Sequence, residues 1–240
     1  MNKFLFYTIF LLANVFAESP LHERYHTYEE IQEQLLIWDE EFGINSNNPP
    51  ILYENSGIIF HLEEIGRSTN DNLPFWGVRL SFNANQKEDE PRTLFLGQCH
   101  AEEIYGVEIT MKIIEMFLNP QNYQQWYMNM RHILSTSEVW VIPTHNPEGL
   151  RVVHGYLEEE EWVQDVSYRK NKRDVDLNGV FDFNVGIGND SDGVDLNRNY
   201  DFNWIFGEEA WVYDNAPGEY QSHYDYYKGE YPWSESEIQA

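Results

Sequence analysis

The chain has 240 residues, and its 15 Lys and Arg against 41 Asp and Glu give a formal net charge of −26. This balance argues against a nucleic-acid-binding protein and against a helix that adheres to membrane surfaces, because both depend on basic side chains. Hydrophobic residues make up 42% of the chain and aromatic residues 16%, so it can bury a sizeable core and is not disordered throughout. We therefore expect no nucleic-acid partner and no stable membrane insertion.

The N-terminus has the pattern of an export signal. Lys3 precedes a largely apolar run at 4–16, and Ala17 follows where a signal peptidase would cleave. The run is short for a membrane span, so we predict that residues 1–17 are a removed signal peptide, a retained anchor being the alternative. Residues 18–240 would then be secreted or extracytoplasmic. The single Cys99 allows no intramolecular disulfide, so packing or a metal must stabilise the exported chain.

The first half of the chain predicts a helix and three strands. The helix is expected at 25–42, because Thr27 and Glu30 form a capping-box pattern and apolar residues follow at helical spacing, and Gly43 ends it. Two strands, at 58–65 and 75–82, are separated by a polar turn and form a hairpin. A third, short strand at 93–96 ends at a glycine.

The next segments predict helices at 105–118 and 123–134 and a buried strand at 138–142, closed by Pro143 and a turn at 146–149. From Arg151 onward the chain is polar and glycine-rich with little periodicity, which indicates a long functional loop. No domain linker is visible. Strands alternating with helices predict an α/β domain with a mixed, mainly parallel sheet flanked by helices.

A candidate metal-binding pair follows the third predicted strand. His100 and Glu103 are three residues apart, so an imidazole and a carboxylate can converge on one cation at the end of a strand, where ligands of α/β sheets bind. A helix start with solvated acids is the alternative for the pair alone. A catalytic zinc needs three protein ligands, and this pair supplies two.

Six segments, in order, resemble the motifs of one family. They are Tyr25–Ile31, His100–Glu103, Asn146–Gly149, Tyr168–Asn171, Gly193–Tyr200 and the stretch 227–237. His-x-x-Glu, Asn-Pro-Glu-Gly, Arg-Lys-Asn and Gly-Val-Asp-x-Asn-Arg-Asn are similar to the motifs of the zinc carboxypeptidases of the carboxypeptidase A type. The combination is far more specific than any one motif, and the chain is identified as a member of that family.

The resemblance implies a metallocarboxypeptidase, which hydrolyses the last peptide bond of a peptide or protein with a free C-terminus. His100 and Glu103 would bind one zinc ion, Arg169 would stabilise the oxyanion, and Asn197 and Arg198 would bind the substrate's terminal carboxylate. A guanidinium suits these roles, because it chelates a carboxylate through two hydrogen bonds and stabilises developing negative charge.

The chain also departs from the family pattern. In the family a second His ligand, a substrate-binding Tyr and a Glu general base follow the Ser-Glu-x-Glu stretch, and here they would lie beyond Ala240. We therefore expect about the first two thirds of a catalytic domain, as a fragment or as an inactive relative. His223 lies in the wrong order to be the third ligand, and His145 is expected to be a structural or rim residue. Glu102 stands where some members carry a substrate-binding Arg.

Two further features leave alternatives open. Asp174, Asp176, Asn178 and Asp182 resemble the first half of a calcium loop, but Val185 occupies the position of the bidentate Glu, and such clusters are usually ordinary turns. Cys99 is expected to be inert. Besides the enzyme, the sequence leaves open a non-catalytic binder of peptide carboxylates and a calcium-stabilised exported interaction module.

Overall fold

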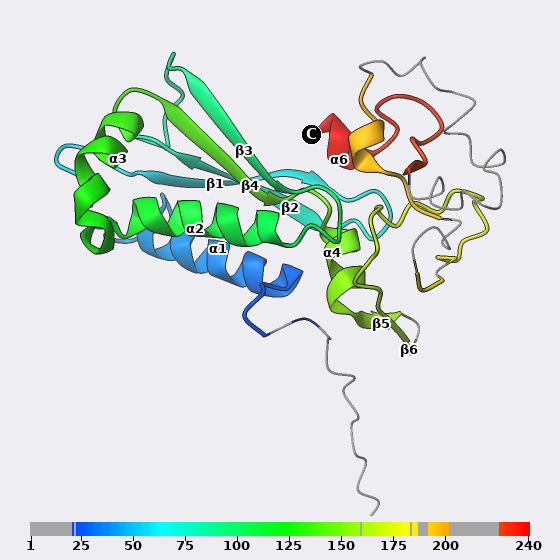
Figure 1. Ribbon diagram of the computed structural model, residues 1–240. Coiled ribbons are helices and arrows are strands. Elements are labelled where there is room, and N and C mark those ends of the chain that lie inside the picture. The colour runs from blue at the N-terminus through cyan, green and yellow to red at the C-terminus, as the bar shows by residue number, and fades with distance from the viewer. Residues whose placement is uncertain (1–20, 22, 159, 183, 187–191, 202–225) are drawn as a thin grey trace, which may run out of the picture.

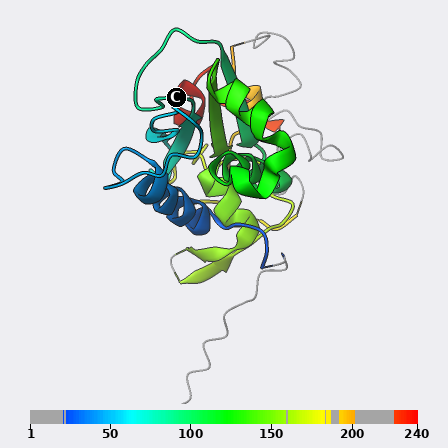
Figure 2. The same cartoon turned by 90° about the vertical axis from the view of Figure 1, so that its left-hand side faces the viewer.

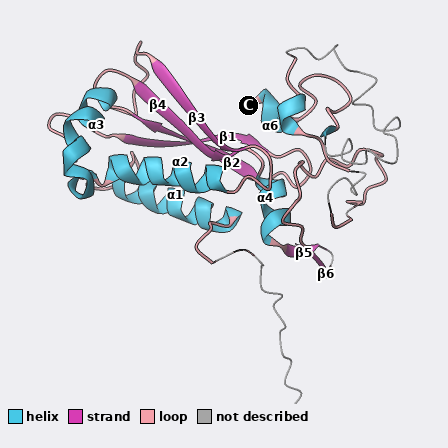
Figure 3. Cartoon of the chain, viewed as in Figure 1, coloured by secondary structure: helices cyan, strands magenta, loops and turns pink. Residues whose placement is uncertain are grey.

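The computed structural model describes residues 21, 23–158, 160–182, 184–186, 192–201 and 226–240. A four-stranded sheet with helices against it is followed by a region of loops and short elements (Figures 1 and 3). The predicted signal peptide at 1–17 and His223 both lie outside the described residues. The signal peptide therefore stays a prediction.

The first helix, α1, spans Tyr28–Phe42. The Thr27 side chain accepts a hydrogen bond from the Glu30 amide, and the Glu30 side chain accepts one from the Thr27 amide, so the capping box is confirmed. The amide of Gly43 bonds to the Asp39 carbonyl at the other end. The helix begins three residues later than predicted, because the Thr27 cap fixes its first turn.

The sheet contains β1 (Phe60–Arg67), β2 (Pro74–Leu80), β3 (Arg92–Gln98) and β4 (Glu138–Thr144) in the order β1-β2-β4-β3. The hairpin β1–β2 is confirmed, and β2 also pairs with β4 in the antiparallel sense. β3 and β4 are parallel. The α/β class with a mixed sheet is thus confirmed. The sheet is not mainly parallel among the described strands, because β2, the second strand of the hairpin, pairs with β4 in the antiparallel sense and only β3 and β4 are parallel.

Eight further elements complete the described chain. They are α2 (Tyr105–Leu118), η1 (Pro120–Trp126), α3 (Tyr127–Leu134), α4 (Pro147–His154), β5 (Tyr156–Glu158), β6 (Glu161–Val163) and, near the C-terminus, η2 (Leu196–Arg198) with α6 (Ser236–Gln239). α2 has the predicted bounds. The second predicted helix is divided into η1 and α3, and Tyr123 leaves the helical conformation within η1.

Three predictions about the middle of the chain were wrong. β4 continues through Pro143 to Thr144. A proline is tolerated there because β2 pairs with β4 only as far as Val141, so β2 needs no hydrogen bond from a backbone amide at position 143. The expected turn at 146–149 is the start of α4. The Asn146 side chain caps it by accepting from the Gly149 amide at 3.0 Å. Beyond Arg151 the chain finishes α4 and forms the β5–β6 hairpin before the loops begin.

The core lies between the sheet and helices α1 and α2, and includes Leu35, Val78, Ile114, Leu134 and Val141. α6 packs near β1, and the β5–β6 hairpin projects from the rest of the fold (Figures 1 and 2). β3 pairs only with β4 among the described strands, and Leu94, Phe95 and Leu96 are 55%, 39% and 47% exposed. This edge of the sheet is therefore apolar and open within the described part of the chain.

Candidate active site

The candidate site lies where the parallel strands β3 and β4 end. His100 follows β3 by two residues and Asn146 follows β4 by two residues. The Asn146 amide donates to the Cys99 carbonyl at 2.9 Å and to the Lys170 carbonyl at 3.1 Å. The amide of Ala101 donates to the Arg169 carbonyl at 3.0 Å. These bonds join the two strand ends to the later loop that carries Arg169.

His100 contacts two carboxylates through its two ring nitrogens. Nδ1 lies 3.1 Å from Glu103 Oε1, and Nε2 lies 3.2 Å from Asp195 Oδ1. The imidazole is buried and Glu103 is exposed, so the pair opens toward solvent on the Glu103 side. Burial lowers the pKa of His100, but the hydrogen bond and the charge of Asp195 outweigh burial and raise the pKa overall.

Arg169 lies against the same imidazole. Its Nε donates to Asp195 Oδ2 at 2.9 Å, its Nη1 reaches Glu102 Oε1 at 3.4 Å, and its Nη2 lies 2.8 Å from His100 Nε2. Asp195 is fully buried, which opposes its ionisation, yet the hydrogen bond to His100 and the charge of Arg169 hold its pKa below the usual value. An anionic Asp195 thus fixes both the imidazole and the guanidinium.

Asn197 and Arg198 lie beside this cluster, on η2. The Asn197 backbone amide donates to Asp195 Oδ1 at 3.0 Å, while its side chain is exposed. The guanidinium carbons of Arg198 and Arg169 lie 5.6 Å and 5.0 Å from the centre of the Tyr226 ring. The structure therefore brings the predicted site residues to one place, where Asp195 and the Tyr226 ring connect His100, Arg169, Asn197 and Arg198.

Three residues of this site were not singled out by the sequence analysis. Asp195 stands inside the Gly-Val-Asp-Leu-Asn-Arg-Asn segment, and Asn146 stands inside the Asn-Pro-Glu-Gly segment. A carboxylate that holds a metal-binding His is a common partner, so Asp195 could have been found by asking what fixes the imidazole. Tyr226 lies outside the quoted motifs, and no sequence signal identifies it.

The donor atoms fit a zinc ion. Two ligands of a tetrahedral zinc, with bonds of about 2.0–2.2 Å, lie roughly 3.4 Å apart, close to the 3.1 Å between His100 Nδ1 and Glu103 Oε1. Asp195 on Nε2 leaves Nδ1 to the metal. Within the described residues, the one group of three or more His, Cys, Asp or Glu side chains close enough to hold a metal ion lies elsewhere, at Asp174, Asp176 and Asp192.

Cys99 and His145 are the direct sequence neighbours of the site residues His100 and Asn146. Burial, together with the charge of Asp195, raises the pKa of the Cys99 thiol to about 12, which agrees with an inert thiol. Burial lowers the pKa of His145 to about 4, and neither of its ring nitrogens has a hydrogen-bond partner in the described structure. His145 lines an apolar cavity beside Leu94 and Trp140. Its expected role as a structural or rim residue stays a prediction.

The candidate calcium loop forms a second cluster. Carboxylate oxygens of Asp174, Asp176 and Asp192 lie within 4.8 Å of one another. Asn178 Nδ2 donates to Asp176 and to Asp182, and the Gly179 amide donates to Asp174. Asp192 accepts from the amides of Val175 and Asp182. The loop is therefore closed by Asp192, which the sequence analysis had not included.

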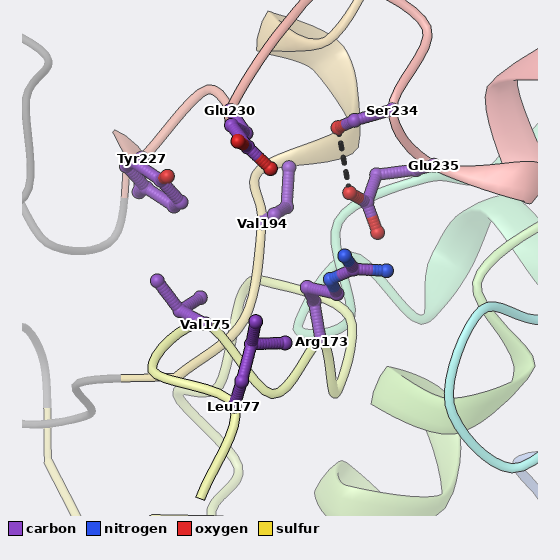
Figure 4. Close-up of a pocket in the computed structure, with 9 residues that line it drawn as sticks. Arg173, Val175, Leu177, Val194, Tyr227, Glu230, Ser234 and Glu235 are labelled. Carbon is purple, nitrogen blue, oxygen red and sulfur yellow. Dashed lines mark hydrogen bonds between the residues drawn. The ribbon is translucent and has the colours of Figure 1, made fainter.

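The C-terminal segment folds back onto the loop after Arg169. Val175, Leu177, Val194 and Tyr227 line one side of a cavity of about 50 Å³, and Arg173, Ser234 and Glu235 line the other (Figure 4). Glu235 accepts from the Asn171 amide group at 2.8 Å, and Ser234 donates to Glu235 at 2.7 Å. The predicted motifs at 168–171, 193–200 and 227–237 are thus packed into one unit.

A His–Glu pair and an Arg–Asp pair thus lie together beyond the ends of β3 and β4. The sequence matches the model of the family described as zinc carboxypeptidase over residues 52–240, so the chain belongs to the zinc carboxypeptidase family, whose members are zinc-dependent peptide hydrolases.

Individual relatives agree with the family assignment. A "Zinc carboxypeptidase" of Saccharothrix mutabilis subsp. capreolus is 25% identical over 148 residues, covering 61% of this chain and 28% of that protein. The "Carboxypeptidase N catalytic chain" of Rattus norvegicus is 21% identical over 197 residues, covering 79% of this chain and 39% of that protein. The chain thus spans less than half the length of these relatives.

The fold is also similar to a solved structure. A crystal structure of thrombin activatable fibrinolysis inhibitor superposes with a TM-score of 0.61 at 18% identity, covering 90% of this chain and 42% of the other. At this identity the likeness shows the fold alone. Among the helices in the described residues, none has the length and apolar character needed to cross a membrane.

Proposed function

We propose that this chain carries the N-terminal part of a metallocarboxypeptidase site, which hydrolyses the C-terminal peptide bond of peptides or proteins. The observation that carries the proposal is the 3.1 Å separation of His100 Nδ1 and Glu103 Oε1, with His100 Nε2 held by the buried Asp195. These two side chains would hold a single zinc ion. When bound, the ion supplies Lewis acidity and lowers the pKa of water.

The two arginines would bind different groups of the substrate. Arg169, held by Asp195 and Glu102, would stabilise the negative charge that develops on the oxygen of the scissile carbonyl. Arg198 is half-buried beside the exposed Asn197, and together they would bind the free carboxylate of the substrate. The Tyr226 ring lies near both guanidinium groups and would set the spacing between these two subsites.

The test measures recognition of the C-terminus and its cleavage separately. The full chain, with zinc in the buffer, is titrated calorimetrically with a short acetylated peptide that has a free carboxylate and with the same peptide as its C-terminal amide. We expect binding of the acid form to be at least ten-fold tighter. The Arg198→Ala variant should lose this preference, and Arg24→Ala, which removes an exposed arginine elsewhere, should keep it.

Mass spectrometry of the same mixtures then distinguishes the candidate functions. Release of the last residue supports the enzyme. Binding of the acid form without release supports a non-catalytic carboxylate binder. Equal binding of both peptides contradicts both functions.

We also propose that the loop at 174–182 binds a calcium ion together with Asp192. Carboxylate oxygens of Asp174 and Asp176 in this loop and of Asp192 lie within 4.8 Å of one another, and Asp192 would take the place of the bidentate Glu that the sequence lacks at Val185. Calcium at 100 times its dissociation constant should stabilise the fold by about 2.7 kcal/mol. Thermal unfolding should show this gain for the native chain and for Asp89→Asn but not for Asp192→Asn. An unchanged melting temperature of the native chain contradicts the site.

We further propose that the protein is exported, with residues 1–17 as the signal peptide and residues 18–240 as part of the catalytic domain. The apolar run after Lys3 supports the proposal. N-terminal sequencing of protein recovered outside the cell should begin at Glu18. A chain that keeps Met1 and stays inside the cell contradicts it.

A further inference from the structure

One ring nitrogen of His100 lies within hydrogen-bond distance of two groups that cannot share it. Its Nε2 is 2.8 Å from Arg169 Nη2 and 3.2 Å from Asp195 Oδ1. A guanidinium only donates hydrogen bonds, and an ionised carboxylate only accepts them. A nitrogen of a neutral imidazole carries either a proton, which it donates, or a lone pair, which accepts. Nε2 can therefore bind Arg169 or Asp195, but not both at once.

The position of the proton on His100 determines which partner Nε2 holds. With the proton on Nε2, the imidazole donates to Asp195 and has a lone pair on Nδ1. With the proton on Nδ1, Nε2 accepts from Arg169 Nη2. Two donors would repel each other at the observed 2.8 Å, which is the length of a hydrogen bond from a charged donor. The arrangement in the structure thus corresponds to a proton on Nδ1, which lies 3.1 Å from the exposed carboxylate of Glu103.

Asp195 does not need the imidazole as a donor. Its Oδ2 accepts from Arg169 Nε at 2.9 Å, and its Oδ1 accepts from the Asn197 amide at 3.0 Å. Because both oxygens keep a donor, loss of the bond from His100 leaves no buried oxygen of Asp195 without a partner. The carboxylate thus permits either position of the proton on His100.

Zinc binding through Nδ1 is compatible with only one of these arrangements. A neutral imidazole binds a metal through the nitrogen that has no proton, so a lone pair on Nδ1 requires the proton on Nε2. Nε2 then donates to Asp195, and Arg169 Nη2 must leave. The Nε bond from Arg169 to Asp195 can persist as a pivot. Nη1 lies 3.4 Å from Glu102, whose second oxygen is buried without a hydrogen-bond partner in the described structure, so the guanidinium has an acceptor to turn toward.

We propose that Arg169 and zinc compete for His100, so that Arg169 Nη2 is free to reach a substrate oxygen only when His100 binds zinc through Nδ1. The observation that carries this proposal is the pair of short distances at Nε2, one to a donor and one to an acceptor. The proposal rests on the proposed function, because it takes His100 as a zinc ligand and Arg169 as the group that stabilises the oxyanion. It adds that Arg169 is withheld from the substrate until the metal site is filled.

Proton–nitrogen correlation spectra of the isotope-labelled full chain show which ring nitrogen carries the proton, and His100→Ala identifies the His100 signals. At mildly alkaline pH, where the imidazole is neutral, we expect the proton on Nδ1 in the chelator-treated native chain and on Nε2 after zinc is added. Arg169→Met should carry the proton on Nε2 with and without zinc. Arg198→Met removes an arginine beside the same Tyr226 ring and should behave like the native chain, because the hydrogen bonds of Nε2 go to Arg169 and Asp195.

Zinc affinity gives a second readout. Competition with a chromogenic chelator should show about ten-fold tighter zinc binding by Arg169→Met than by the native chain, because a hydrogen bond from a charged donor no longer has to break. Arg198→Met removes the same charge and should show a smaller gain. A proton on Nε2 of the native chain without zinc, or equal gains in the two variants, overturns the proposal, and the native chain decides this even if Arg169→Met fails to fold. His100 signals that do not respond to zinc contradict the proposed function as well.

Discussion

The buried acids Glu148 and Glu237 make the stability of this fold depend on pH. Glu148 accepts from the amides of Asn70 and Asp71, at 2.8 Å and 2.6 Å, and Glu237 accepts from the amide of Thr69 at 3.1 Å. Both carboxylates thus bind one short turn between β1 and β2. Burial, followed by the charge of Glu148, raises the pKa of Glu237 to about 7, and burial also raises the pKa of Glu148.

The size of the effect follows from this pKa. Each pH unit by which a folded-state pKa moves is worth about 1.4 kcal/mol, so a rise from 4.5 to about 7 corresponds to roughly 3 kcal/mol. Because the folded pKa lies above the unfolded one, this stability is fully present below pH 4.5 and is lost as the pH rises through 7. The neutral carboxyl is the form that the buried site favours.

The substitution Glu237→Gln should remove this dependence. The amide keeps the shape of the side chain but does not titrate, so its free energy of unfolding should change about 3 kcal/mol less between pH 4.5 and pH 8 than that of the native chain. Urea denaturation at several pH values measures the difference, with the exposed Glu33→Gln as the control. Parallel pH profiles for the native chain and Glu237→Gln would refute the assignment of a raised pKa.

Two further substitutions test the candidate site. Asp195→Asn should weaken zinc binding about 10–100-fold, because the imidazole of His100 loses its anionic partner. Competition with a chromogenic chelator measures the zinc affinity. An unchanged affinity would contradict the role of Asp195 in holding His100. Gly193→Ala should destabilise the fold by at least about 1–3 kcal/mol in urea denaturation. The reason is that Gly193 has φ +89° and that a Cβ there would lie 2.4 Å from the Asn171 carbonyl oxygen. An equal unfolding midpoint would show that this backbone conformation is not required.

Local signals predicted the first half of the fold well. The capping pattern of Thr27 and Glu30 and the apolar spacing in α2 are read from neighbouring residues, and both elements formed as expected. The balance of parallel and antiparallel strands could not be predicted in this way. It depends on β2 pairing with β4, which lies about 60 residues later in the chain.

Loop-forming residues misled the prediction at the middle of the chain. Asn146 and Pro147 are typical of turns, but the same residues also begin helices, as a cap and as the first helical residue. Pro143 is likewise typical of the end of a strand, but β4 continues through it because β2 does not pair with β4 at that position. Tertiary pairing decides whether such residues end an element or begin one. The local sequence does not contain this information.

The candidate site was predicted through motif order, since the spacing of His100 and Glu103 alone is a weak signal. The structure adds the reason for the motif spacing, because Asp195 contacts His100 and Arg169 from 95 and 26 residues away. Tyr226 and Asp192 were missed, because their roles follow only from contacts with distant loops.

The central claim is that His100 and Glu103 bind the same zinc ion. X-ray absorption spectroscopy of the zinc-loaded chain tests it most directly, because imidazole gives a distinct scattering pattern. We predict one imidazole nitrogen at about 2.0–2.1 Å with oxygen ligands at about 2.0–2.2 Å, and loss of the imidazole pattern in His100→Ala. A shell of oxygen ligands alone, identical in the native chain and in His100→Ala, would contradict the claim.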